Sequence, residues 1–301
     1  MGLSAFPGEL AALATALFWA MSSVIYTHLG QKAPPLTLNL LKGLMAIGML
    51  LLTIWLVNDP WPQVSVSTYF WLLLSGAVGI GFGDTVYFAA LNQLGARQTL
   101  LLLVAAPPIA AIGSWLFLQE QLPLLAWVGI SVTIVGIAWV ISERTQAREQ
   151  AKALSWLGIG LALLAAGSEA AGAILSRFAL SQTTIDPLWS AVLRLVGGTV
   201  VVQCLLIYRR ARVLPRSAVQ TQKLLQAVLL ASFFSTYLGI WCQQIALKYT
   251  TPGIAQTLGA TSPLFVLPIV LWQGERVSRK AILGVLVALV GIGILFMYGG
   301  I

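Results

Sequence analysis

The chain has little charge and few of the residues from which enzyme centres are built. Of its 301 residues only 9% are charged, whereas a soluble domain carries about 25%. This leaves too little polar surface to cover a soluble particle of this size, and the 58% hydrophobic content predicts an integral membrane protein. The single histidine excludes a histidine-rich metal site, and no His-Glu-x-x-His motif is present. We therefore expect no enzyme activity, no catalytic or metal-binding residues and no cofactor.

The cysteines and the basic residues also fit a membrane protein. Cys204 and Cys242 lie inside apolar segments and are expected to be small buried hydrophobes. The net charge of +8 does not indicate nucleic-acid binding, because most basic residues lie in short loops between apolar runs. Most of these residues fall on one side of the predicted membrane. The positive-inside rule then places that side in the cytoplasm and both termini outside the plasma (cell inner) membrane.

Apolar runs of about 20 residues are long enough to cross the hydrocarbon core as helices. By that measure the sequence predicts an all-α integral membrane protein with ten transmembrane helices, at residues 8–28, 35–57, 69–91, 98–118, 123–142, 156–178, 187–208, 224–247, 252–273 and 280–298. A nine-span alternative stays open, because only Gln119–Pro123 separates the fourth span from the fifth. The first apolar stretch is expected to be a retained span and not a signal peptide.

A pattern of residues recurs about half the chain apart. In the first copy Asn92–Ala96 precedes an apolar segment that ends at Glu120, and in the second Lys248–Pro252 precedes one that ends at Glu275. An odd number of spans in each half gives the two copies opposite orientations, an inverted repeat that is typical of many secondary transporters. The predicted units are a first five-helix repeat at 1–142, a linker loop at 143–153 and a second five-helix repeat at 154–301.

Four ionisable residues lie well inside the predicted spans: Lys42, Asp84, Glu169 and Arg194. Each costs roughly 2.5–3.5 kcal/mol in hydrocarbon, so we expect these side chains to face the protein interior and to be paired or hydrated. Lys42 and Asp84 lie at similar depth from one membrane face, and Glu169 and Arg194 lie at similar depth from the other. We predict that Lys42 and Asp84 are within salt-bridge reach.

Two interpretations of these charges stay open. They form two internal ion pairs that hold helices together, or a base holds an anionic group of a substrate while an acid binds an amine or carries a proton. Glu169 is the better candidate for a proton carrier because it lies closest to the middle of the membrane, where loss of hydration disfavours a charged carboxylate. Any coupling that we expect is therefore to a proton or another ion.

Polar and aromatic residues near the charges form partial stripes. The eighth span places Ser232, Thr236, Gly239 and Gln243 on one face of a helix. Such a face either hydrogen-bonds to a neighbouring helix or lines a cavity, and for this stripe as a whole we favour a cavity suited to a small zwitterion or an aromatic metabolite. The candidate substrate-binding residues are Trp19, Ser23, Tyr26, Lys42, Asp84, Tyr87, Glu169, Arg194, Thr236, Gln243 and Gln256.

The repeated residues resemble the EamA-type branch of the drug/metabolite transporter (DMT) superfamily, whose members have two five-helix units. Gly274-Glu275 matches the glycine–glutamate pair of that family, whereas Gln119-Glu120 lacks the glycine. Arg194 matches the arginine of the family's second helix, Lys42 is a conservative departure, and Trp19 matches the tryptophan of the first helix. The resemblance covers nearly the whole chain and implies export of amino acids or other metabolites.

The leading hypothesis is therefore a secondary transporter that exports small polar metabolites such as amino acids by alternating access at a central cavity. A lipid or lipid-linked metabolite flippase of the same fold is the alternative, followed by a non-transporting membrane scaffold. The expected partners are the lipid bilayer and a small-molecule substrate, with no nucleic acid, and the chain is expected as a monomer or homodimer. No nucleotide-binding loop is present, so ATP-driven transport would need a partner protein.

Overall fold

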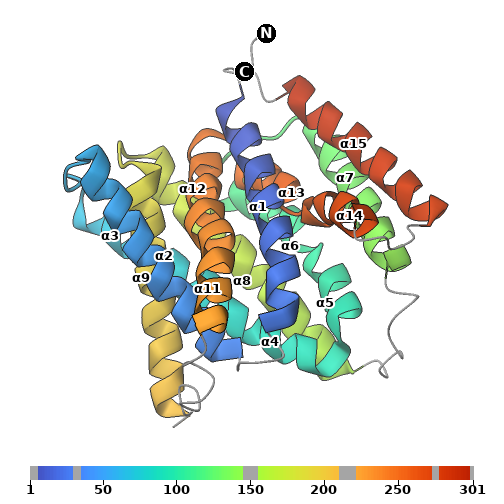
Figure 1. Ribbon diagram of the computed structural model, residues 1–301. Helices are drawn as coiled ribbons and strands as arrows, with labels where there is room; N and C mark the ends of the chain where they lie inside the picture. Colours follow the sequence, from blue (N-terminus) through green and yellow to red (C-terminus); the bar gives the residue numbers. More distant parts are fainter. Residues whose placement is uncertain (1–5, 30–34, 145–154, 210–221, 273–277, 299–301) are drawn as a thin grey trace.

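The computed structural model describes residues 6–29, 35–144, 155–209, 222–272 and 278–298. Within these ranges the chain is all-helical and contains no strand, as the sequence predicts (Figure 1). Helices suit the apolar composition, because in hydrocarbon a helix satisfies all of its backbone hydrogen bonds internally.

The helices divide between the two halves of the chain. The first half contains α1 (Pro7–Leu29), α2 (Pro35–Val57), α3 (Val66–Gly76), η2 (Ala77–Phe82), α4 (Gly83–Leu94), α5 (Ala96–Leu103), α6 (Ala106–Leu118) and α7 (Leu124–Arg144). The second half contains α8 (Trp156–Ser181), α9 (Pro187–Tyr208), α11 (Gln222–Ser232), η3 (Phe233–Leu238), α12 (Gly239–Tyr249), α13 (Pro252–Gly259), α14 (Ser262–Trp272) and α15 (Arg279–Tyr298). α1 begins and α15 ends on the same side of the bundle, which is called the outer face below (Figure 1).

Eight helical stretches in the described part of the chain are long and apolar enough to cross a membrane. They overlap eight of the predicted spans, so the count of ten is not confirmed. The first and ninth predicted spans correspond to α1 and to α13 followed by α14, which are not among the eight. The fourth and fifth predicted spans are separate helices, because α6 ends at Leu118 and α7 begins at Leu124.

Helix interruptions occur at equivalent places in the two halves. The third span turns π-helical at η2, and its counterpart in the second half does so at η3. The fourth span breaks between α5 and α6, and its counterpart breaks between α13 and α14. Pro107 and Pro263 lie in the first turns of α6 and α14, where proline has no intrahelical donor to lose. Interruptions of both kinds recur at functional sites.

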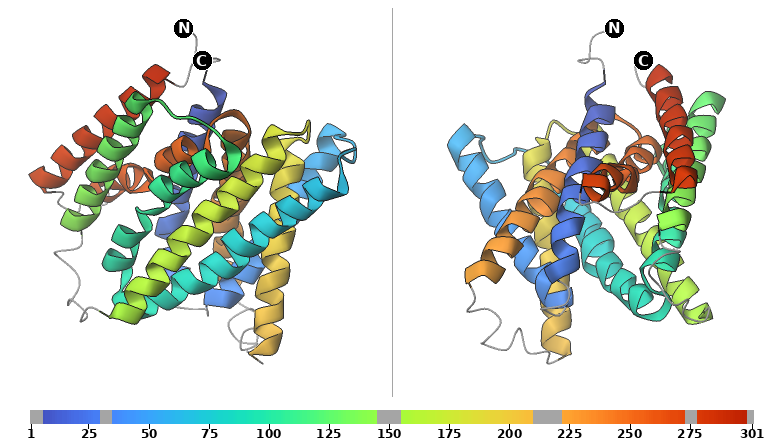
Figure 2. Two further views of the ribbon diagram at one scale, coloured as in Figure 1. Left: turned by 180° about the vertical axis from the view of Figure 1, so that it is seen from behind. Right: turned by 45° about the vertical axis from the view of Figure 1, so that its right-hand side comes forward.

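The two halves pack crosswise. α1 lies against η3, α12 and α13 of the second half, and α8 lies against η2, α4 and α6 of the first half (Figure 2). α2 packs against α9, and α7 packs against α15. The contacts of α1 with η3 and α12 and those of α8 with η2 and α4 are counterparts of each other, as an inverted repeat predicts.

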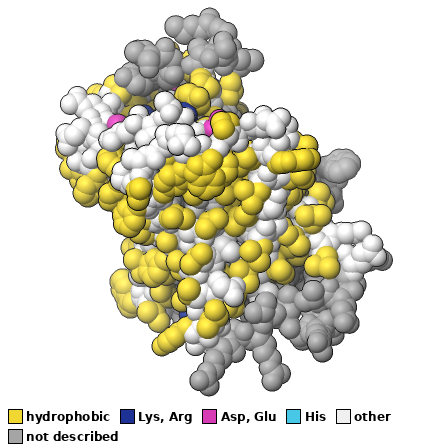
Figure 3. Space-filling view, turned by 90° about the vertical axis from the view of Figure 1, so that its left-hand side faces the viewer, with side chains coloured by type: hydrophobic (Ala, Val, Ile, Leu, Met, Phe, Trp, Pro, Cys, Tyr) yellow, Lys and Arg dark blue, Asp and Glu magenta, His cyan; other side chains and the backbone are white. Residues whose placement is uncertain are grey.

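The outside of the bundle is apolar. Figure 3 shows hydrophobic side chains over most of one face, with only a few charged side chains in view. Trp55 on α2 and Leu124 on α7 are 72% and 80% exposed, which suits contact with lipid. The expectation that both cysteines are buried is wrong for Cys204, which is exposed on the same face of α9 as Val200 and Ile207. Helical spacing places these three residues together on the side of α9 that faces away from the bundle.

The contact between α7 and α15 depends on glycine. A Cβ atom on Gly136 of α7 would meet the backbone nitrogen of Ala288, and it would lie 2.7 Å from the carbonyl oxygen of Gly284. A Cβ atom on Gly291 of α15 would meet the backbone of Thr133 in the same way. The two backbones thus touch directly, and in lipid such close van der Waals contact is what holds helices together.

Replacing Gly136 with alanine will destabilise the protein, although alanine is the better helix former by about 1 kcal/mol. The added methyl group would meet backbone atoms, which have no flexible end to move aside. Gly293→Ala on α15 is the matched control, because nothing lies within 4 Å of its Cβ position. Thermal unfolding in detergent should show a lower melting temperature for Gly136→Ala alone, and equal melting temperatures would contradict the close contact.

Candidate functional site

The charged pair of the first half is in direct contact. Lys42 on α2 places its Nζ 3.2 Å from Oδ2 of Asp84, which lies in the first turn of α4. The two side chains are 23% and 29% exposed, so both are largely withdrawn from solvent. The prediction that these two residues are within salt-bridge reach is confirmed.

Arg194 on α9 is buried without a full set of partners. The residue is 2% exposed, its Nη1 donates to Oγ of Ser176 at 3.4 Å, and its Nε has no hydrogen-bond partner. Glu169 on α8 is half-buried and interacts electrostatically with Arg194. The two nevertheless form no direct ion pair in the part of the chain that the structure describes. The interpretation of two internal ion pairs therefore holds only for the first half.

The four charges belong to one cluster. Asp84 interacts electrostatically with both Glu169 and Arg194, and the phenol of Tyr87 interacts with both acids. Lys42 joins the same group through its ion pair with Asp84. Sequence depth alone assigns the two halves' charges to opposite membrane faces. The packing of α8 and α9 against η2 brings them together.

Glycines on and beside η2 make this approach possible. Nη2 of Arg194 lies 3.2 Å from the place that a Cβ of Gly79 would occupy, and the Cα of Gly172 on α8 lies 3.4 Å from it. A Cβ on Gly76 would collide with the carbonyl group of Arg194. Ser75 donates to the carbonyl oxygen of Gly172 at 2.7 Å. The only sequence signal that could have indicated this contact is the row of closely spaced glycines in the third span.

An aromatic side chain fills the equivalent π turn of the second half. Nε1 of Trp19 donates to the carbonyl oxygen of Ser235 in η3 at 3.0 Å, and Oγ1 of Thr15 donates to that of Gly239 at 3.3 Å. A π turn leaves carbonyl groups outside the regular α-helical ladder, and these two side chains satisfy them. Trp19 is thus held by the protein itself.

The polar stripe of the eighth span faces the interior, because Ser232, Thr236, Gly239 and Gln243 are all buried. Oε1 of Gln243 has no hydrogen-bond partner, and neither has Nε2 of Gln256, which is buried on α13. A buried polar group without a partner costs about 1–3 kcal/mol. These two amides are therefore suited to a ligand or to ordered water.

Other predicted site residues are placed differently. Ser23 is exposed, and its hydroxyl donates to the carbonyl oxygen of Ala20 in its own helix at 2.8 Å. The side chain of Tyr26 lies outside the described part of the chain. Tyr87 contacts the ring of Phe88, with ring centroids 5.6 Å apart. Ser23 is thus the candidate with the weakest structural support.

The outer face carries two further features. Asp59 follows α2 and lies near Asp186, which is the N-cap residue of α9. The pKa of Asp59 is raised, first by loss of hydration and then by the negative charge of Asp186.

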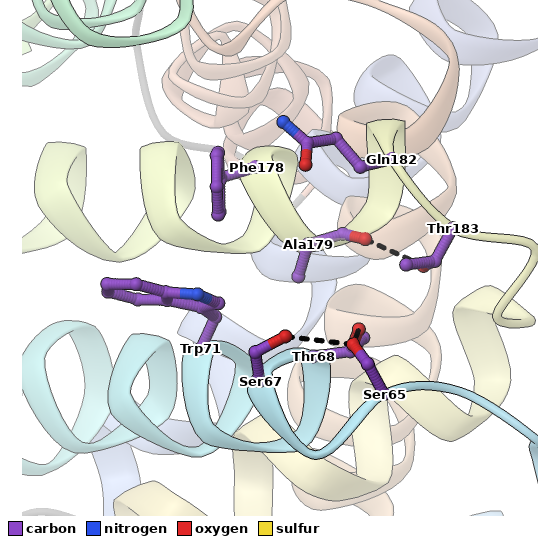
Figure 4. Close-up of a pocket in the computed structure, with 8 residues that line it drawn as sticks. All are labelled: Ser65, Ser67, Thr68, Trp71, Phe178, Ala179, Gln182 and Thr183. Carbon is purple, nitrogen blue, oxygen red and sulfur yellow. Dashed lines mark hydrogen bonds between the residues drawn. The ribbon is translucent and has the colours of Figure 1, made fainter.

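A shallow pocket of about 120 Å³ lies between the start of α3 and the end of α8 (Figure 4). No predicted site residue lines it; its lining residues are Ser65, Ser67, Thr68, Trp71, Phe178, Ala179, Gln182 and Thr183.

Known proteins share this architecture. Residues 6–142 and 156–297 match the EamA-like transporter family. The chain is 30% identical over 148 residues (48% of its length) to an uncharacterized transporter of Synechocystis, sll0355, and covers 43% of it. It is 28% identical over 135 residues (44% of its length) to the uncharacterized transporter YoaV of Bacillus subtilis, and covers 46% of it. The aligned regions thus span less than half the length of these curated relatives.

A solved crystal structure has the same fold. It matches with a TM-score of 0.78 over 96% of both chains, at 15% sequence identity. An identity this low shows the fold alone.

Removing either partner of the Lys42–Asp84 pair will destabilise the protein. Lys42→Met or Asp84→Asn alone should cost about 1–2 kcal/mol, because each removes one partner of an ion pair in a poorly hydrated place. The double variant should recover part of that loss, since it removes both charges of the pair. A double-mutant cycle from unfolding in detergent measures the coupling, and strictly additive losses would contradict a direct pair.

Proposed function

Since the chain belongs to the EamA-like transporter family and is a multi-pass membrane transporter, we propose that it is a secondary transporter working by alternating access at its charge cluster. The observation that carries this proposal is the matched interruption of helices in the two halves, at η2 and η3 and again at α5–α6 and α13–α14. Interruptions at corresponding places of two inverted repeats are the best structural pointer to a transporter's binding site. Of these interruptions, η2 lies against the helices that carry Glu169 and Arg194.

The mixed charges of the cluster favour a small zwitterion, such as an amino acid, as the substrate. The guanidinium group of Arg194 has an unpartnered Nε and can donate to a carboxylate, in bonds about twice as strong as neutral ones. Asp84 and Glu169 can accept hydrogen bonds from an ammonium group. A zwitterion brings one charge of each sign, which limits the cost of occupying a poorly hydrated site.

Further side chains are proposed to extend the site. Tyr87 lies one turn from Asp84 on α4 and offers an aromatic wall. Gln243 on α12 and Gln256 on α13 are candidates because each has a buried amide atom without a partner. Export across the plasma membrane is proposed from the resemblance to amino-acid exporters.

Glu169 is the proposed proton carrier. It has neighbours of both signs, Asp84 and Arg194, and no direct ion pair among the described residues. A carboxylate in such a setting changes its protonation when the charges of a substrate arrive or leave. Proton uptake at one face and release at the other would then couple export to a proton gradient.

Glu169→Gln will abolish or uncouple transport without unfolding the protein, because glutamine keeps the shape of the side chain but does not titrate. Proteoliposomes loaded with a mixture of amino acids should show saturable, pH-dependent counterflow of a labelled amino acid with the wild type. The variant should lose at least about tenfold in rate, or lose the pH dependence. Glu143→Gln is the matched control and should keep the wild-type transport rate. Glu143 lies near the end of α7, and its Oε2 accepts a hydrogen bond from Oγ of Ser278 at 3.1 Å.

The same assay separates the alternatives. Wild-type rates from Glu169→Gln at every pH tested would remove Glu169 from the mechanism. Movement of a labelled lipid by the folded wild type, without exchange of any amino acid, would favour a flippase instead.

A further inference from the structure

Arg177 joins three membrane-spanning segments at the outer face. It lies in the last turns of α8, and its Nε is 2.6 Å from Oε1 of Glu120, which follows the end of α6. Its Nη1 donates to the carbonyl oxygens of Leu247 and Lys248 at the end of α12, at 3.1 and 2.6 Å. A cation at this place also complements the negative end of the dipole of α12.

This contact connects the two halves of the chain above the charge cluster. Glu120 belongs to the first half, whereas Arg177 and α12 belong to the second. Glu169 lies deeper on the same helix as Arg177, by about 12 Å at the rise of an α-helix. Ser176, next to Arg177, accepts a hydrogen bond from Arg194 of the cluster. The ion pair therefore lies between the proposed site and the outer face.

The setting of the pair suits a contact that opens and closes. Alternating access requires helices to separate at one face, and an ion pair that joins separating helices there must then break. The side chains of Arg177 and Glu120 are 16% and 18% exposed, so the pair is largely buried but not fully sealed from the outer face. Oε2 of Glu120 is buried and has no partner, so the carboxylate is held through Oε1 only.

We propose that Glu120, Arg177 and the carbonyl end of α12 form the outer gate of the transporter, which is closed in this structure. Opening toward the outer face breaks the ion pair and frees the two carbonyl groups of α12. The proposal rests on the alternating-access mechanism proposed above. It adds a contact that depth within the membrane does not predict, because Glu120 and Arg177 lie near the ends of helices from different halves of the chain.

Thiol labelling from the outside measures the opening of this gate. Ala173→Cys, in a background with Cys204→Ser and Cys242→Ser, places a reporter one turn below Arg177 on α8, where Ala173 is fully buried. A membrane-impermeant maleimide reaches this thiol only when the outer face opens. Labelling should be slow in the background protein.

Breaking the ion pair should shift the equilibrium toward the outward-open state. Glu120→Gln and Arg177→Met should each raise the labelling rate about tenfold. Lys248→Met is the matched control, because it removes a basic group from the same face and keeps the backbone carbonyl that accepts from Arg177. In the wild type, Nζ of Lys248 donates to the carbonyl oxygen of Ile185 at 2.7 Å. The labelling rate of the Lys248→Met variant should equal that of the background protein.

The outcomes distinguish the gate from a fixed brace. Labelling at the background rate in folded Glu120→Gln would overturn the proposal, and if Arg177→Met does not fold, Glu120→Gln alone decides. The readout needs no substrate, so it is independent of the transport assay. Faster labelling together with no amino-acid counterflow would support the gate and refute the substrate class.

Discussion

The cost of placing charge in hydrocarbon governs how this protein is arranged. Each ionisable side chain inside the spans would cost roughly 2.5–3.5 kcal/mol if it faced lipid. The fold avoids most of this cost by bringing acids and bases of both halves to the place where α8 and α9 pack against η2. The close approach requires glycine, because a Cβ on Gly76 would collide with the backbone carbonyl group of Arg194. The glycine-rich π turn and the charge cluster therefore depend on each other.

The two halves are equivalent in fold but differ in chemistry. At η3 the carbonyl group of Ser235 is occupied by the indole of Trp19, so this π turn is closed by the protein itself. At η2 the neighbour is Arg194, whose Nε has no partner. The carbonyl group of Ser235 in η3 thus has a side-chain partner from α1, whereas the guanidinium group beside η2 retains an unpartnered donor. In the proposed mechanism the contact at η3 fixes α1 to the second half of the chain, and the region at η2 binds the substrate.

Helix positions were predictable from the sequence because the thickness of the bilayer sets the length of an apolar run. Depth within the membrane was also enough to predict the pairing of Lys42 with Asp84. It left the arrangement of Glu169 and Arg194 open, because depth along separate helices does not say which side chains meet. The contact of Arg177 with Glu120 was missed for the same reason. The π turns were hidden as well, since an extra residue in a helical turn leaves the hydrophobic run unbroken.

The central claim is that the mixed charges of the cluster bind both ends of a zwitterion. Competition binding to the purified protein, with a labelled amino acid that shows counterflow, tests this most directly. The intact amino acid should displace the label. The amine that lacks its carboxylate and the acid that lacks its amino group should each compete at least about tenfold more weakly, because each leaves a buried charged group without a partner. Equal competition by an analogue that lacks both charges would contradict the claim.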